Sequence, residues 1–309
     1  MLHRCHCTGN LLEPAERVAD FSPDDLIGLL DLEPLEHNIY RGQNRDIGSG
    51  RIYGGQVLAQ SVVAVGRTVE DDRRIHSMHG YFILPGDLAA PVVYFVDRLR
   101  DGGSFNTRRV TGIQHGRAIF TMSASFHRME AGPEHQAEMP DVPGPDGLPS
   151  ELELLRGMED RIPPKLRRVM TQDRPLDIRP VDPVDPFDPE VREPVNHLWI
   201  RALGAVETPL EHQAVLAYAS DYGLLGAALQ PHGLTWRRGD VMVASLDHAI
   251  WFHGPVDVNE WLLYTMESPV TGGARGFSRG TFFTRDGRLV ASVAQEGLVR
   301  PVDDARPGT

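Results

Sequence analysis

Two long segments of this sequence are apolar on nearly every side, and four segments with strand character follow each of them. The first is Val57–Val65, and the second lies within residues 211–229. A helix that is hydrophobic all round has to be buried. The last hairpins of the two series begin at Gly116-Arg117 and Gly287-Arg288, which lie 171 residues apart. The pattern therefore predicts a duplicated α+β unit, in which each sheet wraps around one buried helix.

The rest of the chain divides around these two units. We expect an extension over residues 1–22 that is disordered, units over 23–130 and 195–301, a connector over 131–194 and a tail over 302–309. Thirteen of the 24 prolines lie in the connector, between Pro133 and Pro194. Because proline lacks an N–H and fixes φ, no continuous helix or sheet is expected there. Short helical pieces such as Glu151–Arg161 fit between the prolines.

Local patterns predict the individual elements. Asp24–Leu32 is expected to be a short helix capped by Ser22, and residues 211–229 a single apolar helix. The expected strands share period-two patterning and turn residues at their ends: His76–Leu84, Pro91–Leu99, Ser104–Gln114, Arg117–His127, His197–Ala202, Val241–Phe252, Trp261–Pro269, Gly273–Thr284 and Arg288–Arg300.

Charge and cysteine content limit the partners and the compartment. The net charge is −12, from 31 basic and 43 acidic residues, which disfavours nucleic acid because phosphate binding needs clustered Lys and Arg. Basic contacts to a small polyanion would have to be local, as at Arg98–Arg100 and Arg108–Arg109. The only cysteines, Cys5 and Cys7, cannot staple the fold, so we expect a cytoplasmic protein. No segment reaches the ~20 apolar residues of a membrane span, and no signal peptide is evident.

Two motifs suggest chemistry that their context does not support. Gly276–Gly280 matches the G-x-S-x-G pattern of serine hydrolases. That mechanism needs a helix after the serine and a later histidine. Here Thr281–Thr284 continues as strand and no histidine follows His253, so a glycine-rich strand is the better interpretation. His3, Cys5, His6 and Cys7 have the residue types of a zinc site, but they are too closely spaced to surround one ion.

Histidines 76 and 79 lie three residues apart in an expected strand. That spacing places them on opposite faces, so they cannot share a ligand. Core or surface positions are the default, although His76 remains a candidate for lining a site.

Asp221 is the most informative polar residue. It lies among apolar neighbours in Tyr218-Ala219-Ser220-Asp221-Tyr222, where a buried carboxylate needs hydrogen-bond donors. The alternative is an exposed stripe or a helix end. Ser245 and Gln295 likewise interrupt apolar strands, and either residue could instead face solvent. Their side chains can donate to a carboxylate and hold a water beside it. Asp221 would then act as a general base, without a covalent nucleophile, metal or cofactor.

At these residues the chain resembles the type II acyl-CoA thioesterases, the TesB-like family, over about residues 25–301. The matching strings are distributed along the whole chain: Ile52–Gln56, His76–Asp87, Leu99–Phe105, Ala131–Gln136, Asp173–Leu176, Tyr218–Asp221, Gln230–Gly233, Asp247-His248, Trp251–His253 and Gln295–Gly297.

The resemblance implies an α+β double hot dog and hydrolysis of acyl-CoA. By position, the family's catalytic Asp, Thr or Ser, and Gln correspond to Asp221, Ser245 and Gln295. Many relatives carry Thr where this chain has Ser245, and Ser lacks the methyl group that restricts the rotamer. The first apolar helix carries Gln60 and Ser61 as its polar members and no acid. One active site per chain is therefore expected.

The substrate site and the assembly are further expectations. The acyl tail is expected between helix and sheet, and Phe82 is a further apolar candidate beside it. The residues expected to bind substrate are Gly54, Gly55, His76, Tyr81 and Trp251. A homo-oligomer is also expected.

Two rival functions remain open at this point. One is an acyl-CoA-binding protein without turnover, although the intact Asp, Ser and Gln argue against it. The other is an acyl-CoA dehydratase on the same fold, which would need an acid and a histidine across the site. His76 and His248 are the histidines that keep this possibility open.

Overall fold

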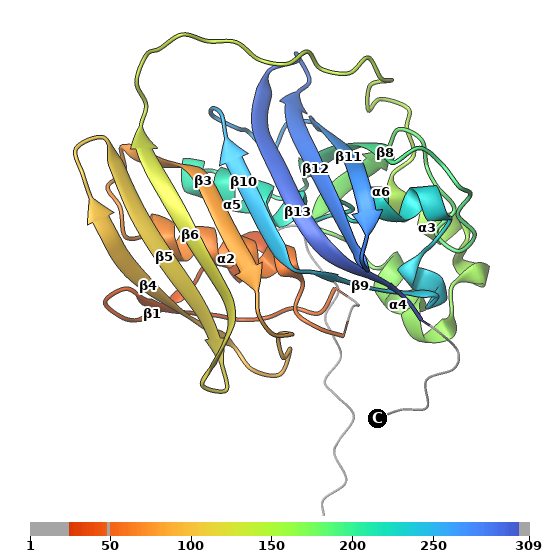
Figure 1. Ribbon diagram of the computed structural model, residues 1–309, viewed down its shortest axis with the longest axis horizontal. Helices are drawn as coiled ribbons and strands as arrows, with labels where there is room; N and C mark the ends of the chain where they lie inside the picture. Colours follow the sequence, from red (N-terminus) through yellow and green to blue (C-terminus); the bar gives the residue numbers. More distant parts are fainter. Residues whose placement is uncertain (1–24, 48–49, 303–309) are drawn as a thin grey trace, which may run out of the picture.

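The computed structural model describes residues 25–47 and 50–302. The expectations for the extension over 1–22, the cap at Ser22, the cluster of His3 to Cys7 and most of the tail lie outside these residues. Within the described part, the architecture is one large antiparallel sheet with two helices packed against one face (Figure 1).

The sheet order is β1-β2-β4-β5-β6-β3-β10-β13-β12-β11-β8-β7, with β9 also paired to β13. The strand bounds are β1 Glu33–Glu36, β2 Ile39–Gly42, β3 Arg73–Phe82, β4 Val92–Asp101, β5 Phe105–Gln114, β6 Arg117–Arg128, β7 Leu176–Pro180, β8 Val195–Ala202, β9 Val241–Ser245, β10 Asp247–Phe252, β11 Leu262–Gly272, β12 Arg275–Thr284 and β13 Leu289–Pro301.

The two halves join where β3 pairs with β10. His79 lies opposite Ala249 in this pairing, and the ladder extends two residues to either side, from Asp247–Tyr81 to Trp251–Ser77. The strands of the first half therefore lie on one side of this junction and those of the second half on the other. This arrangement agrees with the predicted duplication.

The α-helices are α1 Asp25–Leu30, α2 Gly54–Gly66, α3 Glu151–Gly157, α4 Pro164–Thr171, α5 Pro209–Ser220 and α6 Gly226–Leu229, and short 3-10 turns lie at η1 Glu159–Arg161, η2 Gln230–His232 and η3 Trp236–Arg238. Helices α2 and α5 lie behind the sheet (Figure 1). Every residue from Gly55 to Val65 in α2 is buried, as predicted. The buried Gln60 amide is satisfied by Leu29 O and Tyr94 Oη at 2.8 and 2.7 Å.

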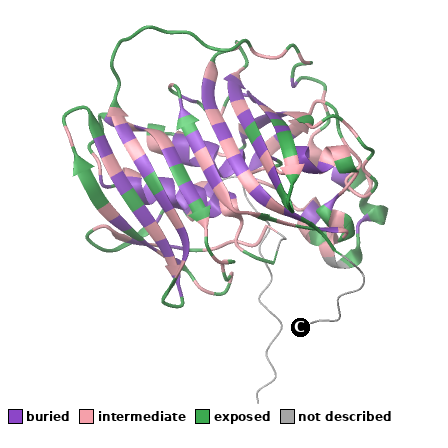
Figure 2. Ribbon diagram, viewed as in Figure 1, coloured by how far each residue is buried: buried purple, intermediate pink, exposed green. Residues whose placement is uncertain are grey.

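Burial alternates along the strands of both halves, which gives the striped pattern of Figure 2. Side chains on the helix-facing side are buried and most of those on the outer side are partly or fully exposed, as the two-residue period of a strand requires. The outer side chains of Trp199, Leu263 and Phe283 are the exception, because connector residues such as Met139 and Leu148 cover them. Close packing on the helix side depends on small residues. A Cβ at Gly280 in β12 would lie 2.5 Å from the Tyr264 ring of β11.

The predicted helix over residues 211–229 is wrong as a single element. Helix α5 begins at Pro209, after a capping box of Thr208 and Glu211, and ends at Ser220. Gly223 has a φ of +74°, a left-handed conformation that a continuing helix does not permit. Asp221 is therefore the C-cap of α5 and does not lie inside the helix.

The proline-rich connector contains helix α4 and strand β7, neither of which was predicted. Strand β7 pairs with β8, with Ile178 opposite Ile200, and forms the last strand of the sheet. Strand β7 is an edge strand, so no further strand in the described part of the chain lies on its outer side. Pro180 at its end is compatible with pairing, because the outer side of an edge strand does not require the N–H that proline lacks. The expected helical pieces are present as α3 and η1. The hairpin of β1 and β2 was also not predicted.

Candidate active site

Asp221 lies where the end of α5 meets the beginning of α2. Its Oδ2 accepts a hydrogen bond from the N–H of Gly55 at 2.9 Å. Tyr53 Oη donates to Tyr218 O at 3.0 Å and holds the two helix ends together. The N-terminus of a helix favours a negative charge because its first N–H groups point outward. The Asp221 carboxylate therefore has a donor and a favourable dipole. Of the two alternatives, the helix end is correct, because Asp221 is the C-cap of α5, whereas the exposed stripe is wrong, because the side chain is partly buried and bonded to Gly55.

A bulge brings Ser245 to the same place. Ser245 pairs with Gly297 and Ala249 pairs with Ala294, so β13 has one residue fewer than its partner over this stretch. An extra residue in one strand shifts the side-chain alternation. Without it, Ser245 would lie on the opposite face from His248. With it, Ser245 Oγ lies 3.5 Å from Asp221 Oδ1.

Gln295 completes the group from the neighbouring strand. Its side chain is buried on β13, and Nε2 donates to Ser245 Oγ at 2.7 Å. The three polar residues predicted to act together thus form a hydrogen-bonded series, Gln295 to Ser245 to Asp221. Hydrogen bonds to Gln295 and Asp221 thus engage the Ser245 hydroxyl on both sides.

The electrostatics of the site favour a base near neutrality. Desolvation raises the pKa of Asp221 from 3.8 to about 7, although donors from Gln295, Gly55 and Ser245 act in the opposite direction. A carboxyl with a pKa near the working pH is suited to accept a proton from water and return it later.

His248 is a site residue that the sequence singled out only for a different function. It is buried on β10, with Nδ1 2.5 Å from Gln295 Oε1 and Nε2 2.9 Å from Ser220 Oγ. Burial lowers its pKa from 6.5 to about 4. A signal was present in the sequence, because His248 alternates with Ile250 and Phe252, which are buried in the structure.

The remaining expected substrate residues divide between the two faces of the sheet. Gly54 lies in the site, since a Cβ there would be 2.7 Å from Asp221 Oδ2 and 3.0 Å from the Phe82 ring. Tyr81 is 62% exposed and Trp251 packs against His79 on the outer face. The expectation that Tyr81 and Trp251 lie between helix and sheet is wrong, because strand alternation directs both of them outward.

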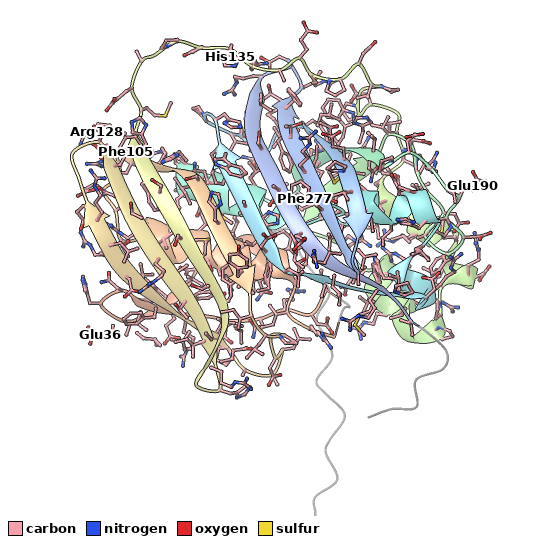
Figure 3. The ribbon with its side chains drawn as sticks, viewed as in Figure 1. Glu36, Phe105, Arg128, His135, Glu190 and Phe277 are labelled. Carbon is pink, nitrogen blue, oxygen red and sulfur yellow. The ribbon has the colours of Figure 1, made fainter. Side chains whose placement is uncertain are left out.

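The predicted separation of His76 and His79 is also wrong. A bulge between Ile75 and Ser77 puts both histidines on the outer face. His76 Nε2 lies 2.8 Å from Ser125 Oγ, and its ring lies against Phe105. Figure 3 labels Phe105 at the far end of the first half, away from the strands that carry Ser245 and Gln295. His76 is not brought to Asp221.

The G-x-S-x-G motif is part of a strand, as predicted. Residues 276–280 all lie in β12, and Ser278 is fully buried and pairs with Gln295 in the ladder. A nucleophile elbow needs an exposed serine between a strand and a helix. A Cβ at Gly276 would lie 2.7 Å from the Ala228 side chain, so the glycine permits close approach of α6.

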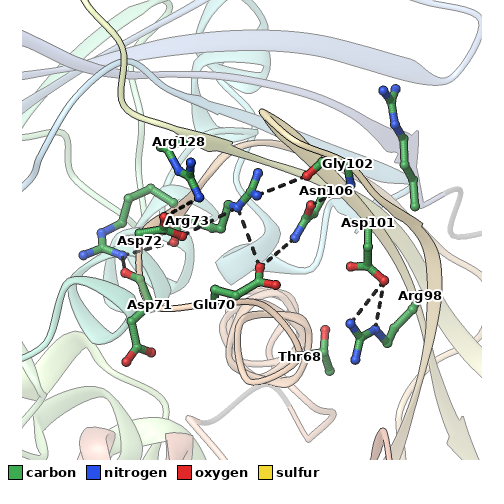
Figure 4. A network of polar contacts seen from close by, with 12 residues as sticks. Thr68, Glu70, Asp71, Asp72, Arg73, Arg98, Asp101, Gly102, Asn106 and Arg128 are labelled. Atoms are coloured by element: carbon green, nitrogen blue, oxygen red, sulfur yellow. Dashed lines mark hydrogen bonds and ion pairs between the residues drawn. The ribbon is translucent and has the colours of Figure 1, made fainter.

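The end of α2 corresponds by chain order to the end of α5, and paired charges occupy it (Figure 4). Glu70 Oε2 accepts from Asn106 and lies 3.7 Å from Arg73 Nε. Asp101 pairs with Arg98 and with the buried Arg108. Of the basic stretches that the sequence offered for a polyanion, Arg98 and Arg108 pair with Asp101 here, and Arg109 pairs with Asp97.

The models of two known protein families match the chain. Residues 43–127 match the model described as the acyl-CoA thioesterase N-terminal domain, and residues 166–298 match the model described as acyl-CoA thioesterase. The first range contains Gly54 and Gly55, and the second contains Asp221, Ser245 and Gln295. Among the helices that the structure describes, none is long and apolar enough to cross a membrane.

Individual relatives agree with these matches. The chain is 39% identical over 281 residues to acyl-coenzyme A thioesterase 8 of Homo sapiens, and the aligned region covers 88% of each chain. It is 40% identical to the solved acyl-CoA thioesterase II TesB2 of Mycobacterium marinum, with a TM-score of 0.73 over 91% of this chain and 99% of that one. A hot-dog-fold protein of unknown function from Alicyclobacillus acidocaldarius is 20% identical, with a TM-score of 0.72 over 90% and 99%, which shows the fold alone. The fold is thus the predicted double hot dog, and the chain belongs to the acyl-CoA thioesterase family.

Proposed function

We propose that the protein hydrolyses fatty acyl-CoA to a free fatty acid and CoA at the site formed by Asp221, Ser245 and Gln295. The observation that carries the proposal is the hydrogen-bonded series of these three side chains at the N-terminus of α2, with Gly55 N–H on the carboxylate. A base, a water-positioning hydroxyl and an amide donor are what direct hydrolysis of a thioester needs.

The chemical steps follow from these positions. Asp221 removes a proton from a water oriented by Ser245 and Gln295, and the water oxygen attacks the thioester carbonyl carbon. Negative charge develops on the carbonyl oxygen, and the N-terminal dipole of α2 stabilises it. The intermediate then expels the CoA thiolate as the C–S bond breaks, and Asp221 returns the proton to the sulfur. No covalent intermediate is required, because a thiolate is a good leaving group.

The rival dehydratase function has little support. It needs a histidine that exchanges protons beside the acid, but His76 lies on the outer face and both ring nitrogens of His248 have neighbours. Formation of enoyl or 3-hydroxyacyl products would revive it.

We also propose a cytoplasmic homo-oligomer. A monomeric mass from light scattering would contradict that assembly.

Release of free thiol from short-, medium- and long-chain acyl-CoAs tests the proposal, with Asp221→Asn beside the wild type. Loss of a general base is expected to lower kcat by ~100-fold or more. Asp286→Asn, in the exposed turn before β13, is a matched control and should retain full activity. If Asp221→Asn were as active as the wild type, the assignment of the base would be wrong. Binding of CoA without hydrolysis of any substrate would instead favour the non-catalytic function.

A further inference from the structure

His248 is a buried titratable residue that the proposed chemistry does not use. It is 1% exposed, and both ring nitrogens have polar neighbours, Gln295 Oε1 at 2.5 Å and Ser220 Oγ at 2.9 Å. Because burial lowers its pKa to about 4, the ring is neutral at pH 7 and carries one N–H and one acceptor nitrogen.

The ring nitrogen that carries this proton determines which group donates in each hydrogen bond from His248 through Gln295 and Ser245 to Asp221. With Gln295 Oε1 facing Nδ1, that nitrogen carries the proton, because an amide oxygen can only accept, and the Gln295 NH2 group points to Ser245. Nε2 is then an acceptor, and the Ser220 hydroxyl donates to it in place of Ala217 O, which lies 2.9 Å from the same hydroxyl. Ser245 is in turn free to donate to Asp221. If Nε2 carried the proton, the amide would have to reverse. Ser245 would then donate to Gln295 Oε1, and the carboxylate would lose that donor.

The two halves of the molecule differ at the positions of His248 and Gln295. His79 and Ala249 form the central pair of the β3–β10 junction, so they occupy equivalent positions in the two halves. The residues that precede them, Met78 in the first half and His248 in the second, are therefore equivalent too. Met78 pairs with Ala124, at the place where His248 meets Gln295. An apolar pair therefore satisfies the packing of this position, and the polar pair is present in the half that carries Asp221.

We infer that His248 is a positioning residue that, as its Nδ1–H tautomer, holds the Gln295 amide with its NH2 group toward Ser245 and Asp221. This inference rests on the proposed function of those three residues. A fixed tautomer that orients a catalytic partner is a general device, and the loss of such an outer hydrogen bond costs activity on the order of 10–100-fold in metal sites.

Two substitutions separate positioning from packing. His248→Met reproduces the residue of the first half and removes the donor, and kcat is expected to fall about 10-fold or more with KM nearly unchanged. His248→Asn places an amide N–H close to the position of Nδ1, and most of the lost kcat should return. A folded His248→Met protein with wild-type kcat would overturn the inference. Equal losses in both variants would do so too.

A measurement without turnover tests the tautomer itself. In protein labelled with 15N at histidine, the ring signals of His248 are expected to show a proton on Nδ1 from pH 5 to 8. A proton on Nε2 would contradict the inference, whatever the activity. If Asp221→Asn stayed active while Nδ1 carried the proton, the proposed base would fail and the orientation of Gln295 would stand.

Discussion

A 2.9 Å hydrogen bond joins the main-chain N–H of Gly55 to Oδ2 of Asp221, across 166 positions of sequence and between the two halves of the molecule. The bond exists because the end of α5 lies in contact with the beginning of α2, and the glycines of α2 allow that approach.

Gly55→Ala is expected to disrupt this junction. Its Cβ would lie 2.4 Å from both Tyr218 O and the Tyr53 ring, so the helix ends must separate. Overpacking of this kind costs about 1–3 kcal/mol. We expect a lower Tm and at least a ~10-fold lower kcat, since the base moves away from its donor. Gly28→Ala in α1, where nothing lies within 4 Å of the added Cβ, is the control and should leave both unchanged or raise Tm slightly. Unchanged activity in Gly55→Ala would show that the contact is dispensable.

The pH profile of kcat/KM should report Asp221. Hydrolysis needs the carboxylate, so activity is expected to rise with pH and reach half its maximum near the pKa of about 7. Tyr53, Tyr218 and Tyr264 surround the carboxyl, but burial raises the pKa of each and keeps them neutral. His248, with a pKa of about 4, does not titrate in this range. An acid limb centred near pH 4 would contradict the raised pKa.

The same pKa predicts an effect on stability. In the folded state Asp221 binds its proton more tightly than in the unfolded chain, where the pKa is 3.8. The stabilisation from this difference is full below pH 3.8 and is lost as the pH rises through about 7. Asp221→Asn carries no charge at any pH, so its Tm is expected to exceed that of the wild type at pH 8 more than at pH 5. His248, whose lowered pKa has the opposite sign, is present in both proteins and cancels in the comparison. An equal Tm difference at both pH values would refute the linkage.

A partly buried charge cluster fixes the connector to the turn that follows Asp221. Tyr222 Oη bonds to Glu151 of α3, and Arg174 Nη1 lies 2.5 Å from Glu151 Oε2 and 3.0 Å from Tyr222 Oη. Burial opposes the Glu151 charge, but Arg174 and Arg237 outweigh it and lower the pKa of the carboxyl.

Glu151→Gln would leave the guanidinium of Arg174, whose side chain is 20% exposed, without its counter-ion. The expected cost is about 3–5 kcal/mol of unfolding free energy, measured by denaturant titration. Asp173→Asn breaks the ion pair with Arg156 instead, in which both side chains are largely exposed, and about 0–1 kcal/mol is expected. Similar losses in the two variants would mean that the cluster adds nothing beyond a surface pair.

Much of the fold followed from periodicity, and the exceptions have local causes. The all-round apolar character of α2 and α5 indicated burial. The limits of several strands followed from turn residues such as His115-Gly116, both with positive φ. The end of α5 was missed because apolar residues resume on both sides of Gly223, at Tyr222 and Leu224. Strand β7 was missed because proline density hid an edge strand, whose pairing depends on β8.

The candidate site was predictable by residue type and only partly by geometry. Asp221, Ser245 and Gln295 stood out as polar residues in apolar surroundings. Neither the bulge that orients Ser245 nor the one that moves His76 outward leaves a pattern in the sequence, because each depends on pairing with a distant strand. The relation of His248 to Gln295 was missed for the same reason.

The acid and the helix that receives it belong to different halves of a single polypeptide. Residues 131–194 link the halves covalently, which makes their meeting an intramolecular event with an effective concentration on the order of millimolar. The contact between Gly55 and Asp221 therefore forms independently of protein concentration. A chain cut within this segment, with its fragments separated, would have to reassemble by a second-order encounter. Its rate would then rise with the product of the two fragment concentrations.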